Sequence, residues 1–258
     1  MDEGIDLRDV LRDWEFDPQH NIRVLRAENG REIMQVRLPL GVEQYEMDGR
    51  PDGRRPHNCE SALDFYLERH GRPTAEGHPG EFTLGAAECA ELMEEGTLYY
   101  YRYLHLFQIG DWKRTVRDTT RNIVLFDFLK QHAERPEGRV AMEKWRPYLL
   151  RMNGVSQAMI ELGKKNYGRA MDIVQQAMQA IRGLPEIEDE AFRFERQRSL
   201  DALDALVAQI AKSRPLTEEE RLDAEMKKAV ASEEFEKAAE LRDKIRDLHT
   251  RVQASNPA

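Results

Sequence analysis

The sequence predicts an α+β protein that is mostly helical, with a small N-terminal antiparallel β-meander followed by antiparallel helical hairpins. Three observations support this fold class. Polar and apolar residues alternate strictly over residues 34–40, apolar residues recur at helical spacing from about residue 58, and glycine or proline separates the helical stretches. Charged residues make up 34% of the chain and hydrophobic residues 40%, which is typical of long helices with large polar surfaces.

Three strands are expected between residues 21 and 47. The middle strand is the most regular, and its alternation places four apolar side chains on one face: Met34, Val36, Leu38 and Leu40. Asn29-Gly30 precedes this strand and favours a two-residue hairpin turn, because both residues tolerate positive φ. Pro39 indicates an edge position or the end of the strand.

Helices are expected over most of the remaining chain, because the apolar period changes from two to about 3.6 residues. Their expected ranges are residues 1–13, 61–70, 84–109, 112–133, 141–162, 167–181, 190–212, 218–231 and 234–252. Gly110, Gly163 and Pro215 stand between successive helices and separate them.

These elements predict five segments along the chain. They are a small β-meander domain with short helices at 1–80, helical hairpins at 81–185, a long linking helix at 186–215, a two-helix hairpin at 216–252 and a disordered tail at 253–258. The tail is expected to fray because it is short, polar and terminal.

Two of the expected hairpins share a local pattern. In each, a glycine precedes the second helix, an aromatic residue (Trp112 or Tyr167) stands early in that helix, and a small residue (Thr115 or Ala170) follows three positions later. The pattern resembles tetratricopeptide-type hairpins, although the aromatic positions are 167 − 112 = 55 residues apart and not about 34. The resemblance implies stacked helical hairpins, and an irregular helical bundle with similar turns is the alternative.

A tyrosine cluster lies in the helix expected over residues 84–109. It consists of Tyr99, Tyr100, Tyr101 and Tyr103. Consecutive helix positions point all round the helix, so some of these rings must be core and others surface. The cluster either lines a ligand groove or packs in the core with its hydroxyls at the rim.

The charge and the apolar content restrict the class of protein. The net charge of −9 favours a protein partner over a nucleic acid, whose phosphates are usually held by a basic face. No run approaches the roughly 20 apolar residues of a membrane helix, and the acidic N-terminus lacks the features of a secretory signal. Two cysteines, Cys59 and Cys89, suit a reducing compartment. A cytoplasmic protein without a membrane partner is therefore expected.

Two apolar stripes run at helical spacing along residues 221–249. The first stripe consists of Leu222, Met226, Ala229 and Val230. The second consists of Phe235, Ala238, Leu241 or Arg242, Ile245 and Leu248. A turn at 231–233 lets the two helices pack along these stripes, and Ala238-Ala239 permits close approach.

This spacing resembles the UVR motif, the short helical hairpin shared by the excision-repair proteins UvrB and UvrC. It is also similar to hairpins of McsA-class kinase activators and ClpC-type chaperones. Glu233 stands where the repair proteins often carry an apolar residue, so the form SEEFEKAAELRD is nearer the regulatory versions. The resemblance implies protein contact, because such hairpins pair with similar hairpins. The predicted partner-binding residues are Leu222, Met226, Phe235, Ala238, Ala239, Leu241, Arg242, Ile245 and Leu248.

An isolated two-helix hairpin keeps an uncovered apolar face. Either the rest of this chain covers that face in cis, or a second copy, a UVR-like hairpin or another protein covers it in trans. Nucleic acid is a disfavoured partner. Residues 218–248 hold eleven Asp or Glu and seven Lys or Arg, a sum of 7 − 11 = −4, and phosphate binding needs the opposite sign.

Motifs of enzymes and metal proteins are missing from the sequence. It contains no GxxxxGK[ST], GxGxxG or GxSxG, and no CxxC pair of a structural zinc site. His57, Cys59, His70, His78 and Cys89 are spread without ligand spacing. A non-enzymatic protein without cofactor or metal is therefore expected.

A turn-rich loop over residues 48–57 concentrates positive charge. Its candidate anion-binding residues are Arg50, Arg54, Arg55 and His57. They suit a carboxylate, a phosphate or an acidic peptide. The alternative is a solvated loop in which Asp48 and Asp52 neutralise the arginines.

Together these patterns predict a cytoplasmic bacterial adaptor or regulator that acts through the UVR-like hairpin. Two other functions follow from the resemblance. One is a DNA-repair accessory that contacts the nucleotide-excision machinery, and the other is a regulator of a Clp-type protease or a protein-arginine kinase.

Overall fold

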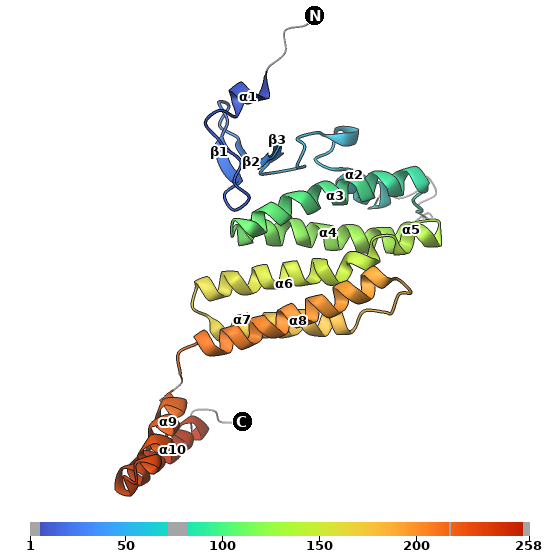
Figure 1. The fold of residues 1–258 in the computed structure, drawn as a ribbon. Coiled ribbons are helices and arrows are strands. Elements are labelled where there is room, and N and C mark those ends of the chain that lie inside the picture. Colours follow the sequence, from blue (N-terminus) through green and yellow to red (C-terminus); the bar gives the residue numbers. More distant parts are fainter. Residues whose placement is uncertain (1–5, 72–81, 217, 255–258) are drawn as a thin grey trace, which may run out of the picture. The chain divides into compact units, whose positions relative to one another are not determined.

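A computed structural model describes residues 6–71, 82–216 and 218–254 of the chain (Figure 1). It divides the chain into two compact units, Met1–Ala208 and Gln209–Ala258, called here the N-terminal and C-terminal units. The described residues are mostly helical and contain one three-stranded antiparallel sheet and a C-terminal helical pair, which confirms the predicted fold class.

The sheet of the N-terminal unit is an antiparallel meander of β1 (Ile22–Arg26), β2 (Glu32–Leu38) and β3 (Gly41–Glu46), in the order β1-β2-β3. Its register pairs Val24 with Met34 and Met34 with Tyr45. The buried face of the sheet and the residue after β3 form a small core with one residue of helix α3 (Ala86–Gln108): Met34, Val36, Tyr45, Met47 and Leu106. The alternation of β2 therefore decides which face of the sheet meets the helices.

Two local predictions for the sheet are wrong. Leu40 does not share the buried face, because β2 ends at Leu38 and the exposed Leu40 lies in the turn after Pro39. The turn at Asn29-Gly30 is not a two-residue loop with two positive φ angles. Only Gly30 has positive φ (83°), and its N–H donates to the Ala27 carbonyl, as in a type I turn followed by a glycine bulge.

The other described elements of the N-terminal unit are helices. They are α1 (Leu7–Val10), η1 (Pro56–Asn58), α2 (Ala62–Gly71), α3 (Ala86–Gln108), α4 (Trp112–His132), α5 (Pro136–Val140), η2 (Glu143–Trp145), α6 (Arg146–Gly163), α7 (Tyr167–Arg182) and α8 (Glu190–Ser213), which runs past Ala208. Helices α3 and α4 form one antiparallel pair, α6 and α7 form a second, and α4 packs against α6 (Figure 1). The likeness to tetratricopeptide hairpins stays a prediction.

Small residues bring α6 and α7 into close contact. A Cβ added at Gly154 would lie 2.6 Å from the Cβ of Ala177. Ala170 lies seven residues before Ala177 on the same face of α7 and is fully buried. The two helices therefore touch where neither carries a large side chain, as the spacing of Ala170 and Ala177 predicts.

Three antiparallel helix pairs end their first helix in the same way: α3–α4, α6–α7, and the pair of α9 (Glu218–Ala231) and α10 (Phe235–Ala254) in the C-terminal unit. Gly110, Lys165 and Glu233 each have positive φ, at 74°, 61° and 58°. In each turn the next residue's N–H donates to a carbonyl five residues back, at 2.8 to 2.9 Å, which is the hydrogen bond of a Schellman motif. Gly163, which the sequence suggested as the turn residue, is instead the last residue of α6.

The start of the second helix is also shared among the three pairs. Its first residue is aromatic in each: Trp112, Tyr167 and Phe235. The residue three positions later is small and buried in each: Thr115, Ala170 and Ala238. The pattern that the sequence showed in two hairpins is therefore present in all three.

Lys165 occupies a backbone conformation that favours glycine, so Lys165→Gly is expected to stabilise the N-terminal unit by about 0.5–1 kcal/mol. A left-handed conformation costs an L-residue roughly 1–2 kcal/mol, and the greater chain entropy of glycine removes part of the gain. Urea unfolding followed by tryptophan fluorescence measures this, because Trp14, Trp112 and Trp145 all precede residue 208. Gly110→Ala is the matched control and should destabilise. The prediction would be contradicted if both variants changed the free energy of unfolding in the same direction.

A buried ion pair attaches the sheet to the helices. Arg102 of α3 donates from Nε and Nη2 to the two carboxylate oxygens of Asp118 of α4, at 2.7 and 2.8 Å. Its Nη1 donates to the carbonyls of Glu46 and Gly49, both at 2.8 Å. Both charged side chains are almost completely buried. The guanidinium therefore joins two helices to the end of β3 and the loop that follows it.

Candidate functional site: a C-terminal helical hairpin

The C-terminal unit contains the hairpin of α9 (Glu218–Ala231) and α10 (Phe235–Ala254). Its core consists of four buried residues, Leu222, Ala229, Ala238 and Leu241. Met226, Ile245 and Leu248 pack against this core and are partly buried. The two predicted stripes therefore face each other, because residues three and four positions apart share one side of a helix.

The predicted partner-binding residues fall into two groups in the structure. Six of them hold the hairpin together: Leu222, Met226, Ala238, Leu241, Ile245 and Leu248. Phe235, Ala239 and Arg242 are exposed. Phe235 is 66% exposed, and the exposed Val230 lies on the other side of the turn. The exposed large apolar side chains of the hairpin therefore lie beside its turn.

Charged side chains on the hairpin pair with one another. Lys227 lies 2.7 Å from Asp223, Lys237 3.1 Å from Glu234, and Arg246 3.3 Å from Asp243. Such exposed pairs stabilise a helix only slightly. They nevertheless place acidic groups beside these basic side chains, and the acidic residues outnumber them.

The arginine loop is partly used for structure. The side chain of Arg50 is almost buried, with Nε 3.3 Å from Asp52 Oδ1 and 3.4 Å from Glu95 Oε2, although neither contact has hydrogen-bond geometry. Glu95 itself accepts the backbone N–H groups of Ala62 and Leu63, at 2.7 and 3.0 Å, at the start of α2. Arg50 is thus balanced by two carboxylates inside the fold.

The other residues of the predicted anion site separate into two places. Arg54 and Arg55 are exposed and line a depression of about 190 Å³ together with Arg50. Its lining also includes Arg31 and three acidic residues: Glu46, Asp48 and Glu60. His57 is not part of this lining. Its Nε2 lies 3.0 Å from Glu91 Oε1, and its ring stacks on Phe65. Anion binding by this loop stays a prediction.

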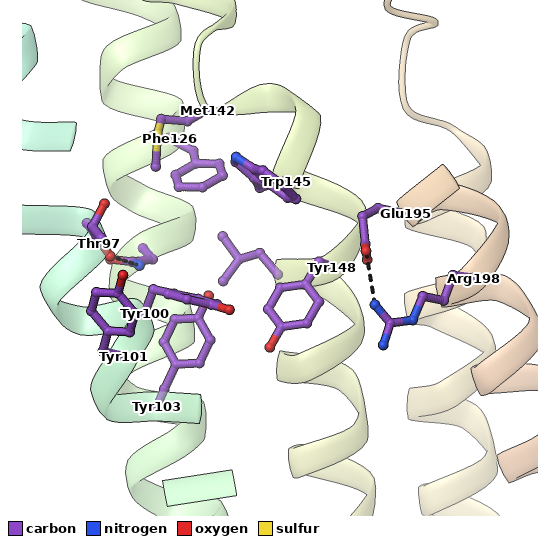
Figure 2. Close-up of a pocket in the computed structure, with 13 residues that line it drawn as sticks. Thr97, Tyr100, Tyr101, Tyr103, Phe126, Met142, Trp145, Tyr148, Glu195 and Arg198 are labelled. Carbon is purple, nitrogen blue, oxygen red and sulfur yellow. Dashed lines mark hydrogen bonds and ion pairs between the residues drawn. The ribbon is translucent and has the colours of Figure 1, made fainter. Parts of the chain in front are cut away.

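The tyrosine cluster of α3 divides between the core and a pocket. Tyr99 is buried, and its hydroxyl donates to the Gly49 carbonyl at 3.3 Å. Tyr100, Tyr101 and Tyr103 line a pocket of about 340 Å³ in the N-terminal unit (Figure 2). Its other lining residues include Trp145, Tyr148 and Glu195, which the sequence did not single out because they come from η2, α6 and α8.

Both cysteines are free thiols, Cys89 buried and Cys59 half-buried. Burial, and then the charge of Glu88, raise the pKa of the Cys89 thiol, which disfavours the nucleophilic thiolate.

The described residues contain no group of three or more His, Cys, Asp or Glu side chains able to hold a metal ion. His78 lies outside the described residues, as do residues 255–258 of the predicted tail. Gln253 and Ala254 belong to α10.

Helices α9 and α10 form a two-helix hairpin, and comparison with known families agrees with this fold. A model of the UvrB/UvrC motif matches residues 220–251, which confirms the predicted resemblance and indicates protein interaction in general. The match covers only the hairpin. No curated protein and no solved structure matches the chain. Within the described part of the chain, no helix is long and apolar enough to cross a membrane.

Proposed function

We propose that this chain is a cytoplasmic bacterial adaptor or regulator without enzymatic activity, which binds another protein through the turn end of its C-terminal hairpin. One observation carries the proposal. Within a hairpin that matches the UvrB/UvrC motif, Phe235 and Val230 flank the turn and are exposed. Burying a phenylalanine contributes about 1.5–3 kcal/mol, which an exposed ring leaves unused until a partner covers it.

The equivalent aromatic residues of the other two helix pairs differ from Phe235. Trp112 and Tyr167 hold the same position after the turn and are half-buried. Trp112 packs edge-on against Phe107 of its own pair, with ring centroids 5.1 Å apart. Since Phe235 has the same local backbone but greater exposure, local helix geometry does not account for its exposure. An exposed aromatic ring at a turn whose geometry is repeated in the other two helix pairs favours contact with another molecule.

The charge of the hairpin indicates what kind of partner fits best. Residues 218–248 carry a formal sum of −4, so two copies would bring like charges together. A partner protein whose hairpin carries an apolar face and a basic rim is therefore favoured over a second copy of this chain. The same sign disfavours a DNA phosphate backbone as the ligand.

Phe235→Asp is expected to abolish capture of the partner while leaving the fold intact. Tagged wild-type and variant proteins are used to capture proteins from lysate, bound proteins are identified by mass spectrometry, and circular dichroism checks folding. Phe194→Asp is the matched control, because Phe194 is 64% exposed on α8 and lies in the N-terminal unit.

The outcomes separate the alternatives. A protein lost with Phe235→Asp and retained with Phe194→Asp supports the proposal, and its identity distinguishes a repair pathway from a protease or kinase pathway. Retention of all captured proteins by a folded Phe235→Asp variant would overturn it. Sedimentation of the wild type at low and high salt tests self-association, which charge repulsion should suppress at low salt.

A further inference from the structure

The outer edge of β1 is an unpaired side of the sheet. The strand order is β1-β2-β3, so β1 has a neighbouring strand on one side only (Figure 1). Its pairing with β2 runs unbroken from Ile22 to Arg26, without a proline or a bulge. Natural edge strands are commonly shielded by one of these devices or by a covering segment. The described residues place no strand beside β1 other than β2, so its outer edge is open to a further strand.

Two hydrogen bonds fix the alternation of the ladder between β1 and β2. Before β1, the Arg37 N–H donates to the Asn21 carbonyl at 2.7 Å. After β1, the Ala27 N–H donates to the Arg31 carbonyl at 2.8 Å. In an antiparallel ladder every second residue pair is hydrogen-bonded, so the odd-numbered residues of β1 bond to β2. The N–H and C=O groups of the even-numbered residues therefore point outward.

The even-numbered residues of β1 are Ile22, Val24 and Arg26. Among the described residues, no group forms a hydrogen bond with their backbone N–H or C=O. The other edge of the sheet differs, because Glu46 of β3 donates its N–H to the Pro51 carbonyl and its own carbonyl accepts from Arg102. An unpaired row of donors and acceptors at strand spacing fits an extended backbone and not a helix, whose N–H and C=O groups bond to each other.

Apolar side chains at this edge are uncovered on both faces of the sheet. Val24 stands opposite Met34, which is buried in the sheet core, yet Val24 itself is 43% exposed. Leu25 points to the other face and is 37% exposed. A further strand with apolar residues opposite Val24 and Leu25 would cover both side chains and extend the existing core.

Positive charge marks the same edge. Residues 21–31 hold three arginines and one glutamate, a sum of 3 − 1 = +2, in a chain of net charge −9. Arg23 is engaged by its own sheet, because it donates to Gln35 Oε1 and its guanidinium lies over the Trp14 ring. The Arg26 side chain is 74% exposed, and its Nη2 lies 4.0 Å from Glu32 Oε1, beyond hydrogen-bond distance. Arg26 is therefore available to a carboxylate on a partner.

We propose that β1 binds an extended segment of another protein, which adds a fourth strand to the sheet in the more stable antiparallel orientation. The segment carries an acidic residue opposite Arg26 and apolar residues opposite Leu25 and Val24. A second copy of this chain fits less well, because β1 contains two arginines and no acidic residue, and pairing β1 with itself brings like charges together. This docking site is separate from the hairpin and does not depend on the function proposed for it.

A pentapeptide tests the assignment on the full-length protein. Acetyl-Glu-Ile-Val-Thr-Ile-amide, bound antiparallel, places its glutamate opposite Arg26 and its central valine opposite Val24. Isotope labelling of the protein's valines lets nuclear magnetic resonance follow binding through the Val24 amide signal, which is assigned with Val24→Ile. The expected result is a saturable shift of this signal, because the Val24 N–H gains a hydrogen bond.

Methylation of single peptide nitrogens tests the backbone hydrogen bonds. N-methylation of the central valine should weaken binding on the order of tenfold, because it removes an N–H that donates to β1 and places a methyl group against the strand. N-methylation of the threonine is the matched control, because its N–H points away from β1, and it should leave binding unchanged.

A charge exchange tests the register. A peptide with lysine in place of its glutamate should bind the wild type about threefold more weakly, and Arg26→Glu should reverse this preference. Arg169→Glu, the same change at an exposed position of α7, should preserve it.

Four results would overturn the proposal. The first three are no shift of the Val24 amide signal at millimolar peptide, equal weakening by the two N-methyl groups, and an unchanged preference for glutamate in an Arg26→Glu variant that circular dichroism shows to be folded. The fourth is a shift of the Val24 signal with protein concentration in the absence of peptide, which would assign the edge to a second copy of this chain.

Discussion

Asp118→Ala is expected to destabilise the N-terminal unit by about 3–5 kcal/mol, the usual effect of removing one partner from a buried ion pair. The substitution leaves the guanidinium of Arg102 buried without its carboxylate. Arg117 loses a contact as well, since its Nε donates to Asp118 Oδ1 at 2.9 Å. The two carbonyls that Arg102 also binds cannot replace a negative charge, because they carry only partial charges.

Urea unfolding with tryptophan fluorescence measures this effect. Asp48→Ala is the control, because Asp48 pairs with Arg117 at 2.8 Å but is 80% exposed, and its loss should cost less than about 1 kcal/mol. The double variant Arg102→Met with Asp118→Leu should recover much of the loss, since it removes both buried charges together. If Asp118→Ala and Asp48→Ala cost the same, the buried pair does not hold the sheet to the helices.

Gly154→Ala is expected to destabilise the same unit by about 1–3 kcal/mol, although alanine is the better helix former. The added methyl would lie 2.6 Å from the Ala177 Cβ, so α6 and α7 must move apart. Each helix contributes to the core through neighbouring positions, and therefore the shift also loosens packing beyond the contact itself.

A second glycine substitution, which should change the stability in the opposite direction, serves as the control. Gly168 lies in α7 with nothing within 4 Å of an added Cβ, so Gly168→Ala should stabilise by about 0.5–1 kcal/mol. Exchanging the two residues at the contact, Gly154→Ala with Ala177→Gly, should restore part of the stability. A stabilising Gly154→Ala would show that the two helices can separate at little cost.

Local patterns in the sequence were sufficient to predict most elements of the fold. The alternation at Met34 and Val36 indicated the buried face of β2, and the apolar stripes of the last two helices indicated the hairpin core. Leu40 was misplaced because the alternation continues past Pro39, whereas the strand does not. Periodicity reports the side-chain pattern but not where a turn interrupts it.

The shared turn was harder to recognise. Only Gly110 carries the residue that marks a left-handed C-terminal position, while Lys165 and Glu233 adopt that position despite their side chains. The nearest glycine, Gly163, drew the prediction two residues too early. The turn geometry is repeated in all three helix pairs although its glycine is not. This is possible because the hydrogen bonds of the turn involve only backbone atoms.

The candidate sites show what spacing along the chain cannot reveal. The sequence singled out the tyrosines on α3, but their partners Trp145, Tyr148 and Glu195 come from distant segments. Likewise, Arg50 looked available for anions because its neutraliser Glu95 is far away along the chain. The hairpin at 220–251 could be identified because its contacts are nearly all local.

The contacts of Arg102 also influence the order in which the chain folds. Each helix pair closes a turn of a few residues, whereas Arg102 reaches carbonyls that lie 56 and 53 positions earlier. Closing a long loop costs more chain entropy than closing a short one, so non-local contacts form more slowly. The helix pairs therefore provide the surface that the meander meets late. Until Arg102 is in place, β2 presents Met34 and Val36 to water, and this interval is when the unfinished chain is most exposed to aggregation.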